Sequence, residues 1–203
     1  MTISMANHWW WRPGWREGRT FYTWHLTFRD APDVHRLAAT YRHALADVPG
    51  LDLVPDQWLH LTMQGLGFTD EVPDEDVNAI VDAATSRLAH SGAFDLTLHR
   101  PAITPEAIRW EAQPAEPAAA VRTAIRHAIG DVWRNVPEEP DGFAPHVSIA
   151  YSNSKGPAEP VQQALDSVDT VPATARVRAV ELIVLGRDRQ MYEWDTHTRI
   201  SLS

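Results

Sequence analysis

Hydrophobic and polar residues alternate along seven short segments of the chain, which is the pattern of half-buried β-strands. Threonine, β-branched and aromatic residues are frequent in these segments, and Gly, Pro or Asp residues separate them. The predicted strands cover residues 19–28, 58–66, 93–99, 107–113, 143–150, 177–185 and 191–202. The last two are expected to form a hairpin around Gly186.

Four other segments place apolar residues three or four positions apart, which predicts amphipathic helices. In the first of them, Val34, Leu37 and Tyr41 share one face. Asp30 stands at its start as a capping residue, and Gly50 follows its end. The predicted helices cover residues 30–48, 73–90, 117–132 and 157–168.

The elements follow one another in two similar series. The order is β-α-β-α-β and then β-α-β-α-β-β. In each series a histidine follows the beginning of the first strand by a nearly equal interval, 40 residues from Thr20 to His60 and 39 residues from Ala107 to His146. We therefore expect an internal structural duplication within one two-lobed domain over residues 19–203, preceded by an irregular Trp- and Arg-rich arm over residues 1–18.

Each of these histidines lies in a predicted strand with a hydroxyl residue two positions later. Because side chains alternate across a strand, His60 shares a face with Thr62, and His146 shares a face with Ser148. On spacing alone, an ordinary strand histidine explains each pair equally well. The equivalent placement in the two halves favours one shared site.

The chemistry that suits this set is the cleavage of a phosphodiester. Such a reaction at neutral pH needs one group that takes a proton and another that gives one, and histidine can do both because its usual pKa lies near 6.5. The hydroxyls of Thr62 and Ser148 can donate hydrogen bonds to the non-bridging phosphate oxygens. His60 and His146 are therefore the candidate catalytic residues, and the two hydroxyl residues are the candidate phosphate ligands.

The segments "HLTMQGLG" at 60–67 and "PHVSIAYS" at 145–152 resemble the two motifs of the 2H phosphoesterases, which include the bacterial 2′-5′ RNA ligase and cyclic phosphodiesterase proteins. The resemblance covers roughly residues 19 to 203, because the order of elements also matches. It implies a two-lobed, pseudo-symmetric α+β fold, with antiparallel sheets flanked by helices around a central cleft. It also implies metal-independent chemistry without a cofactor on 2′,3′-cyclic phosphates, 2′-5′ linkages or RNA-end phosphodiesters.

Four further residues are candidate substrate contacts. Many ligase-like members of the family carry a basic residue where this chain has Tyr151. Strict alternation after Ser148 would place Tyr151 in the core, and a bend would turn it to the cleft. His25 lies on the polar face of the first strand, as a half-exposed residue or a cleft residue. Trp11 and Arg12 belong to an interleaved Trp and Arg segment that suits either lobe packing or contacts to nucleotide bases and phosphates.

Composition removes several classes of function. The chain has no cysteine, which excludes disulfides, thiolate zinc sites and a cysteine nucleophile. Its net charge of −9 argues against non-specific binding of duplex DNA. No segment has the roughly 20 apolar residues of a membrane span, and residues 1–15 hold no apolar run of the signal-peptide type. We expect a cytoplasmic protein, most simply a monomer.

Two alternatives to catalysis by a histidine pair remain open from the residues. A zinc site needs three or four ligands, and the sequence holds no HxH or HxxxH pair. A non-catalytic module that binds a nucleotide or an RNA end would use the same cleft. Two intact histidine-hydroxyl pairs favour the enzyme, because a binding module has no need of two proton-transfer groups.

Overall fold

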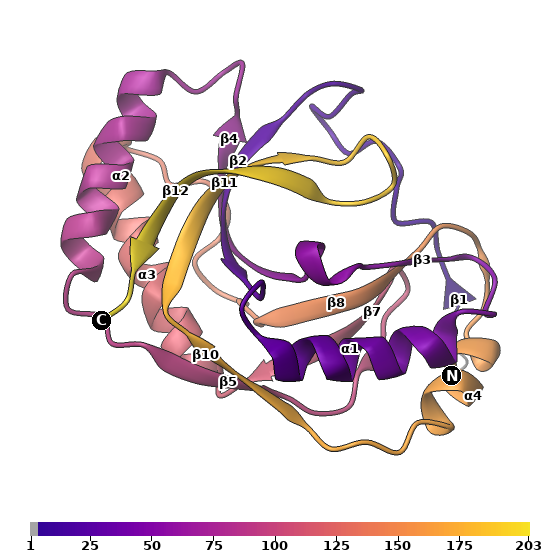
Figure 1. Cartoon of the computed structure of the whole chain (residues 1–203). Coiled ribbons are helices and arrows are strands. Elements are labelled where there is room, and N and C mark those ends of the chain that lie inside the picture. Colours follow the sequence, from indigo (N-terminus) through magenta and orange to yellow (C-terminus); the bar gives the residue numbers. More distant parts are fainter. Residues whose placement is uncertain (1–3) are drawn as a thin grey trace.

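The alternating segments form two main antiparallel sheets in the computed structural model, which describes residues 4–203 (Figure 1). The first sheet has the strand order β12-β11-β2-β4, and the second has the order β10-β5-β7-β8-β3, with β6 paired to β7. The strands are β1 Ser4–Met5, β2 Phe21–Thr27, β3 Leu51–Leu53, β4 His60–Phe68, β5 Phe94–Leu98, β6 Ala102–Ile103, β7 Ala107–Gln113, β8 His146–Ser152, β9 Gly156–Pro157, β10 Ala173–Val177, β11 Ala179–Gly186 and β12 Glu193–Ser201. Strand β1 pairs with β9 in a separate two-stranded sheet.

The helices cover the outer sides of the sheets. Helices α2 and α3 pack against each other and contact β12 and β4 of the first sheet, while α1 contacts β3, β8 and β10 of the second (Figure 1). The helices are α1 Pro32–Leu45, α2 Asp74–Leu88, α3 Ala115–Val132 and α4 Glu159–Asp166, with a 3₁₀ turn at Asp56–Trp58. Over residues 4–203, no helix is both long and apolar enough to cross a membrane.

The start of α1 differs from the sequence prediction. The helix begins at Pro32 with Ala31 in the N-cap position, and no side chain caps it, so the prediction that Asp30 is the capping residue was wrong. Proline suits the first helical position because its φ angle is already helical and its missing N–H has no partner to lose there.

The two halves of the chain exchange strands. Strands β3 and β5 come from the first half but pair with β8 and β7 of the second sheet, and β11 and β12 come from the second half but extend the first sheet beside β2. Each sheet is therefore built around two neighbouring strands of one half, β2 and β4 or β7 and β8, and also contains two strands of the other half. This arrangement confirms the expected α+β fold of antiparallel sheets flanked by helices.

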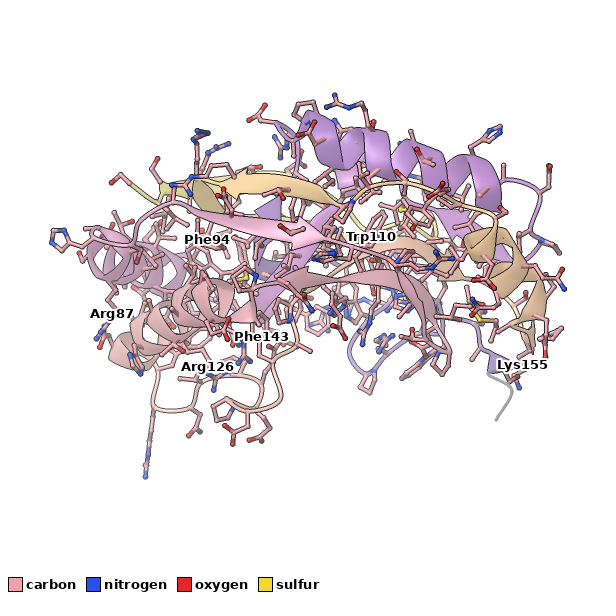
Figure 2. The ribbon with its side chains drawn as sticks, turned by 90° about the horizontal axis from the view of Figure 1, so that it is seen from below. Arg87, Phe94, Trp110, Arg126, Phe143 and Lys155 are labelled. Atoms are coloured by element: carbon pink, nitrogen blue, oxygen red, sulfur yellow. The ribbon has the colours of Figure 1, made fainter. Side chains whose placement is uncertain are left out.

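Large aromatic side chains occupy the interior. Trp24 on β2 and Trp110 on β7 are fully buried, and Figure 2 shows Trp110 in the middle of the molecule, with Arg87 and Lys155 near opposite ends. Leu61 and Val147, which flank the two histidines, are also fully buried. The strands that carry the histidines are therefore anchored by their apolar neighbours.

Residues 4–18 pack along this domain. Trp9 is buried to 8% exposure, and its indole N–H donates a hydrogen bond of 2.8 Å to Asp52. Gly14 has φ +82°, and a Cβ atom there would approach the ring of Phe68 to 2.6 Å. Only glycine combines this backbone conformation with so close an approach, so the turn brings the arm tightly against the first sheet.

We expect the two neighbouring tryptophans Trp9 and Trp11 to differ in their effect on stability. Trp9→Ala removes a buried ring and should lower the free energy of unfolding by about 3 kcal/mol. Trp11 is 51% exposed, and Trp11→Ala is the matched control, with an expected change within about 0.5 kcal/mol. Urea unfolding of the three proteins measures both values. Equal changes in the two variants would show that the arm does not contribute to the core.

Candidate active site

A cavity of about 530 Å³ lies between the facing sides of the two sheets. Its walls come from β2 and β4, from β7 and β8, from the N-terminal arm and from the turn after β11. His60, Thr62, His146 and Ser148 all line it. The structure thus brings together both histidine-hydroxyl pairs that the sequence singled out.

The two histidines are held in the same way. His60 Nδ1 lies 2.8 Å from the carbonyl oxygen of Trp58, and His146 Nδ1 lies 2.8 Å from that of Ala144. A carbonyl only accepts hydrogen bonds, so each Nδ1 carries the proton and donates it. In the neutral ring, Nε2 then keeps its lone pair. The same tautomer, fixed by the carbonyl two residues earlier, is present on both sides of the cavity.

Burial makes both histidines neutral. Desolvation lowers the pKa of His60 to about 4; the hydrogen bond to Trp58 opposes this shift, and the nearby His146 adds to it. Desolvation also lowers the pKa of His146, against the hydrogen bond to Ala144 and together with the positive charge of Arg109. Neither ring is protonated at neutral pH in the substrate-free protein.

A third histidine supports the first. The ring of His25 stacks on His60 with centroids 4.3 Å apart and planes 8° apart, and Trp194 meets both rings edge-on. His25 is 1% exposed, and its Nε2 lies 3.4 Å from the hydroxyl of Thr62. Burial lowers its pKa well below the usual value, so His25 adds no charge beside His60. It fixes the position of the His60 ring.

Tyr151 lies on the cavity face, although alternation from Ser148 would place it in the core. Arg109 pairs with Ser148 and Ile108 with Ala150, so Ile149 is an extra residue in β8. This β-bulge shifts the alternation by one position. Tyr151 consequently lines the cavity, yet it is only 5% exposed because its ring stacks on His8 at 4.5 Å. Burial raises its pKa, so the phenol stays protonated.

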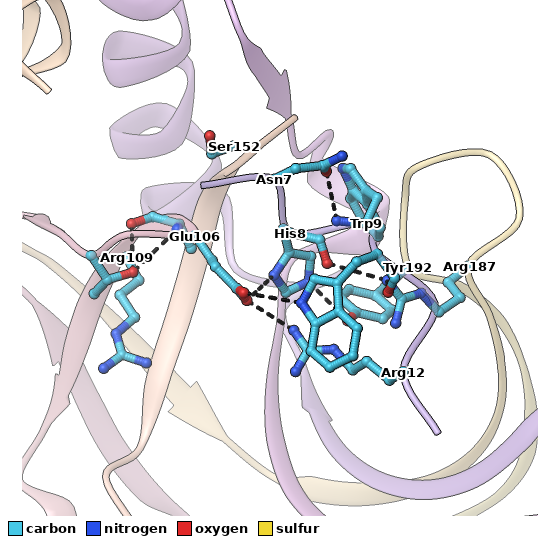
Figure 3. Close-up of polar contacts among 12 residues, drawn as sticks. Asn7, His8, Trp9, Arg12, Glu106, Arg109, Ser152, Arg187 and Tyr192 are labelled. Atoms are coloured by element: carbon cyan, nitrogen blue, oxygen red, sulfur yellow. Dashed lines mark hydrogen bonds and ion pairs between the residues drawn. The ribbon is translucent and has the colours of Figure 1, made fainter. Parts of the chain in front are cut away.

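The two candidate contacts from the arm have different positions. Arg12 lines the cavity and forms an ion pair of 2.9 Å with Glu106, which also accepts hydrogen bonds from His8 and Trp10 (Figure 3). Trp11 is half exposed and does not line the cavity. Of this pair, only Arg12 is placed to meet a ligand.

Sequence reasoning missed two other arginines that line the cavity. Arg109 on β7 approaches His146 Nε2 to 3.3 Å, and Arg187 follows directly after β11. Alternation along residues 107–113 could have placed Arg109 on the polar face of this strand. In the structure Arg109 pairs with Ser148, which lies on the cavity face. Nothing in the local pattern marks Arg187, since a residue in a hairpin turn can point in any direction.

The same cavity offers no cluster for a metal ion. No group of three or more His, Asp or Glu side chains within residues 4–203 is arranged to hold one. Its acidic residues already have partners: Glu106 in the arm cluster, and Glu138 with the backbone N–H of Gly65 at 3.0 Å.

Comparison with known proteins gives a family and a fold. The model of a family described as the 2′-5′ RNA ligase superfamily matches residues 28–189. The crystal structure of the Thermus thermophilus protein TT0787 is similar, with 18% identity, a TM-score of 0.68 and coverage of 91% of this chain and 97% of that one. Escherichia coli LigT complexed with 3′-AMP is also similar, at 17% identity, a TM-score of 0.65 and coverage of 91% and 99%. No curated protein matches the chain.

The lowered pKa of His60 predicts a pH-dependent stability. Unfolding restores the pKa to about 6.5, so between pH 7 and pH 5 the unfolded chain binds more protons than the folded one. The free energy of unfolding therefore decreases as the pH is lowered from 7 to 5. His60 should account for about 2 kcal/mol of this loss. In His60→Asn, the free energy of unfolding should therefore fall less over this range.

Urea unfolding at pH 7 and pH 5 measures the difference, and His127→Asn is the control because His127 is exposed on α3. A loss in His60→Asn as large as that of the unsubstituted protein would show that His60 is not buried in the neutral form.

Proposed function

Because the chain belongs to the 2′-5′ RNA ligase superfamily of 2H phosphoesterases, we propose that it is a metal-independent phosphoesterase acting on 2′,3′-cyclic phosphates, 2′-5′ linkages or RNA-end phosphodiesters. The observation that carries the proposal is the matched pair of histidines. Each donates its Nδ1 proton to a backbone carbonyl, and both line one cavity. Two such groups across one space are what general acid and base catalysis at a single phosphorus needs.

In this proposal His60 is the general base. It is the more deeply buried histidine, and its contacts with His25 and Trp194 leave little water to solvate a charged ring. Its lone pair on Nε2 accepts the proton of the attacking water as the new oxygen–phosphorus bond forms. A base must be neutral before it accepts a proton, and the low pKa of His60 keeps its ring neutral at working pH.

His146 is the general acid. Negative charge on the bound phosphate raises the pKa of a neighbouring imidazole, so substrate binding itself protonates His146. The guanidinium of Arg109, which faces Nε2 in the free protein, then turns to the phosphate oxygens. As the phosphorus–oxygen bond to the leaving ribose oxygen breaks, His146 gives that oxygen its proton.

Three groups are placed to hold the non-bridging oxygens. Thr62 is exposed to the cavity, and Ser148 lies on the same cavity face as His146. Arg109 pairs with Ser148 across the two strands and adds a positive charge. Hydrogen bonds from these three groups are strongest when charge develops on the oxygens in the transition state.

The alternative function is a non-catalytic module that binds a nucleotide or an RNA end. One feature favours it: the cavity wall includes the aromatic rings of Trp15 and Phe21, stacked at 5.8 Å, which can hold a base without any chemistry. Turnover of a substrate separates the two functions.

A substrate screen in EDTA tests the enzyme. We expect turnover of at least one of 2′,3′-cyclic nucleotides, 2′-5′ dinucleotides and RNA ends with a cyclic phosphate, because no step needs a metal ion. Chromatographic separation of the substrate from its products measures the turnover. Binding without turnover of any of the three would identify the binding module instead, and activity that returns only with zinc or magnesium would contradict the metal-independent mechanism.

Histidine variants are the controls of this screen. His60→Ala and His146→Ala should each lower kcat by about 10²–10⁴. The double variant should cost little more than the worse single one, because the two groups act as a unit. His127→Ala, on the exposed face of α3, should leave kcat unchanged. Near-normal kcat in a folded His60 or His146 variant would defeat the two-histidine mechanism.

The pH dependence of the rate follows from the lowered pKa values. The dependence of kcat/KM reports the free enzyme, where the pKa values of both histidines lie below the usual 6.5. Its bell-shaped curve should therefore be centred below pH 6.5. The dependence of kcat reports the bound complex and should be centred at higher pH, because the phosphate raises the pKa of His146. Initial rates over pH 4 to pH 9 give both curves, and the opposite order would contradict protonation by the substrate.

A further inference from the structure

Arg187 is a buried cation in the cavity wall without a negative partner. It is 4% exposed and lines the cavity. Its Nη2 donates hydrogen bonds to the carbonyl oxygens of His8 at 3.3 Å and Trp10 at 3.2 Å. Its Nη1 is buried without any hydrogen-bond partner among residues 4–203, and within the same range no carboxylate lies within 4.0 Å of its guanidinium. A buried charge in this state is costly unless a ligand neutralises it.

The acidic residue in this part of the cavity, Glu106, already accepts hydrogen bonds from other side chains. Glu106 accepts hydrogen bonds from Arg12 and His8, as the dashed lines of Figure 3 show, and a further one from the indole N–H of Trp10. Glu106 therefore makes no direct contact with the guanidinium of Arg187. Burial lowers the pKa of Arg187, and the charge of Glu106 opposes this shift without cancelling it, although arginine remains charged at any working pH.

Aromatic rings hold the guanidinium in place. The rings of Trp9, Trp11, Trp15 and Tyr192 lie between 5.5 and 5.9 Å from its central carbon. They keep water away from the cation and add cation–π attraction. A guanidinium that is fixed and poorly hydrated suits phosphate especially well, because it binds two oxygens of the same group.

The cavity therefore presents two separate arginines without carboxylate partners among residues 4–203. Arg109 stands beside His146, where the reacting phosphate is proposed to lie. Arg187 stands on the far side of the chain of contacts formed by Glu106, His8 and Tyr192 (Figure 3). Tyr192 connects this second position to the proposed base, since its ring lies 5.8 Å from the Arg187 guanidinium and 6.0 Å from the ring of His60.

We propose that Arg187 binds a second phosphate group of the substrate, one nucleoside away from the phosphate that reacts. This inference rests on the proposed function and narrows its substrate class to nucleotides with two phosphate positions. The second group is either the 5′-phosphate of a single nucleotide or the next phosphodiester of an RNA strand. Both are anions with free oxygens for the guanidinium.

Calorimetric titration of the full chain tests the second position without any need for turnover. The probes are adenosine 3′-monophosphate, adenosine 3′,5′-bisphosphate and the 3′-phosphorylated dinucleotide ApAp. The two ligands with a second phosphate should bind roughly 10- to 100-fold more tightly than the monophosphate, since a hydrogen bond between charged groups is among the strong ones. Preference for the bisphosphate over ApAp indicates a 5′-phosphate, and the reverse indicates an RNA strand.

The substitution Arg187→Gln should abolish this preference. The matched control is Arg189→Gln, two residues away, where the side chain is 79% exposed and paired with Glu193; it should keep the preference. The ratio of two affinities in one preparation does not depend on the folded fraction, and the comparison in the unsubstituted protein stands even if Arg187→Gln is unstable.

Equal affinities of the unsubstituted protein for all three nucleotides, or no binding of any, would overturn the second phosphate position. An unchanged preference in Arg187→Gln would overturn the role of this residue. Failure of the phosphoesterase proposal is seen separately, as an absence of turnover in the substrate screen. A clear affinity ratio without turnover would retain the phosphate position in a binding module.

Discussion

The site depends on one packing constraint. Helices cover the outer side of each sheet, so the polar side of each sheet has to face the other sheet. Helices α2 and α3 contact the first sheet, and α1 contacts the second. The apolar neighbours of the two histidines, such as Leu61 and Val147, are fully buried on the opposite faces of their strands. Alternation then directs His60 and His146 into one shared space. The cavity is the consequence of packing, and the strand exchange between the halves holds it together.

β-Bulges adjust this simple alternation. In β8 the extra residue Ile149 returns Tyr151 to the face of His146 and Ser148. In β4 the pairing with β2 is shifted twice, so that Thr62 pairs with His25 and Gly65 with Thr23 on the cavity face. Each bulge inserts one unpaired residue and so shifts the alternation of the strand by one position. The bulges therefore change which residues face the cavity, with Tyr151 in place of Ala150 and Gly65 in place of Gln64.

The electrostatics of the cavity suit an anion that arrives from outside. Burial keeps His60 and His146 neutral, while Arg109 and Arg187 keep positive charges without carboxylate partners among residues 4–203. The acidic residues Glu106 and Glu138 are occupied by arm and backbone donors. Under the proposed function, a bound phosphate would both neutralise the arginines and raise the pKa of a histidine. Binding and protonation would then be two results of the same charge.

Local patterns in the sequence predicted the four helices, seven of the strands and the two motifs, because helical and strand periodicities are local and because a histidine with a hydroxyl two positions later depends only on alternation. The sequence left two interpretations open for His25 and Arg12, which line the cavity in the structure. It did not predict β3 or β10, short strands that exist only because they pair with β8 and β5.

The remaining features of the site depend on tertiary structure. The bulge at Ile149 arises from the pairing of β8 with β7, and the position of Arg187 arises from the strand exchange that carries β11 to the first sheet. The pKa values of the histidines depend on burial by residues distant in the chain. Local sequence encodes which side chains share a face, but only packing decides which faces meet and how much water remains between them.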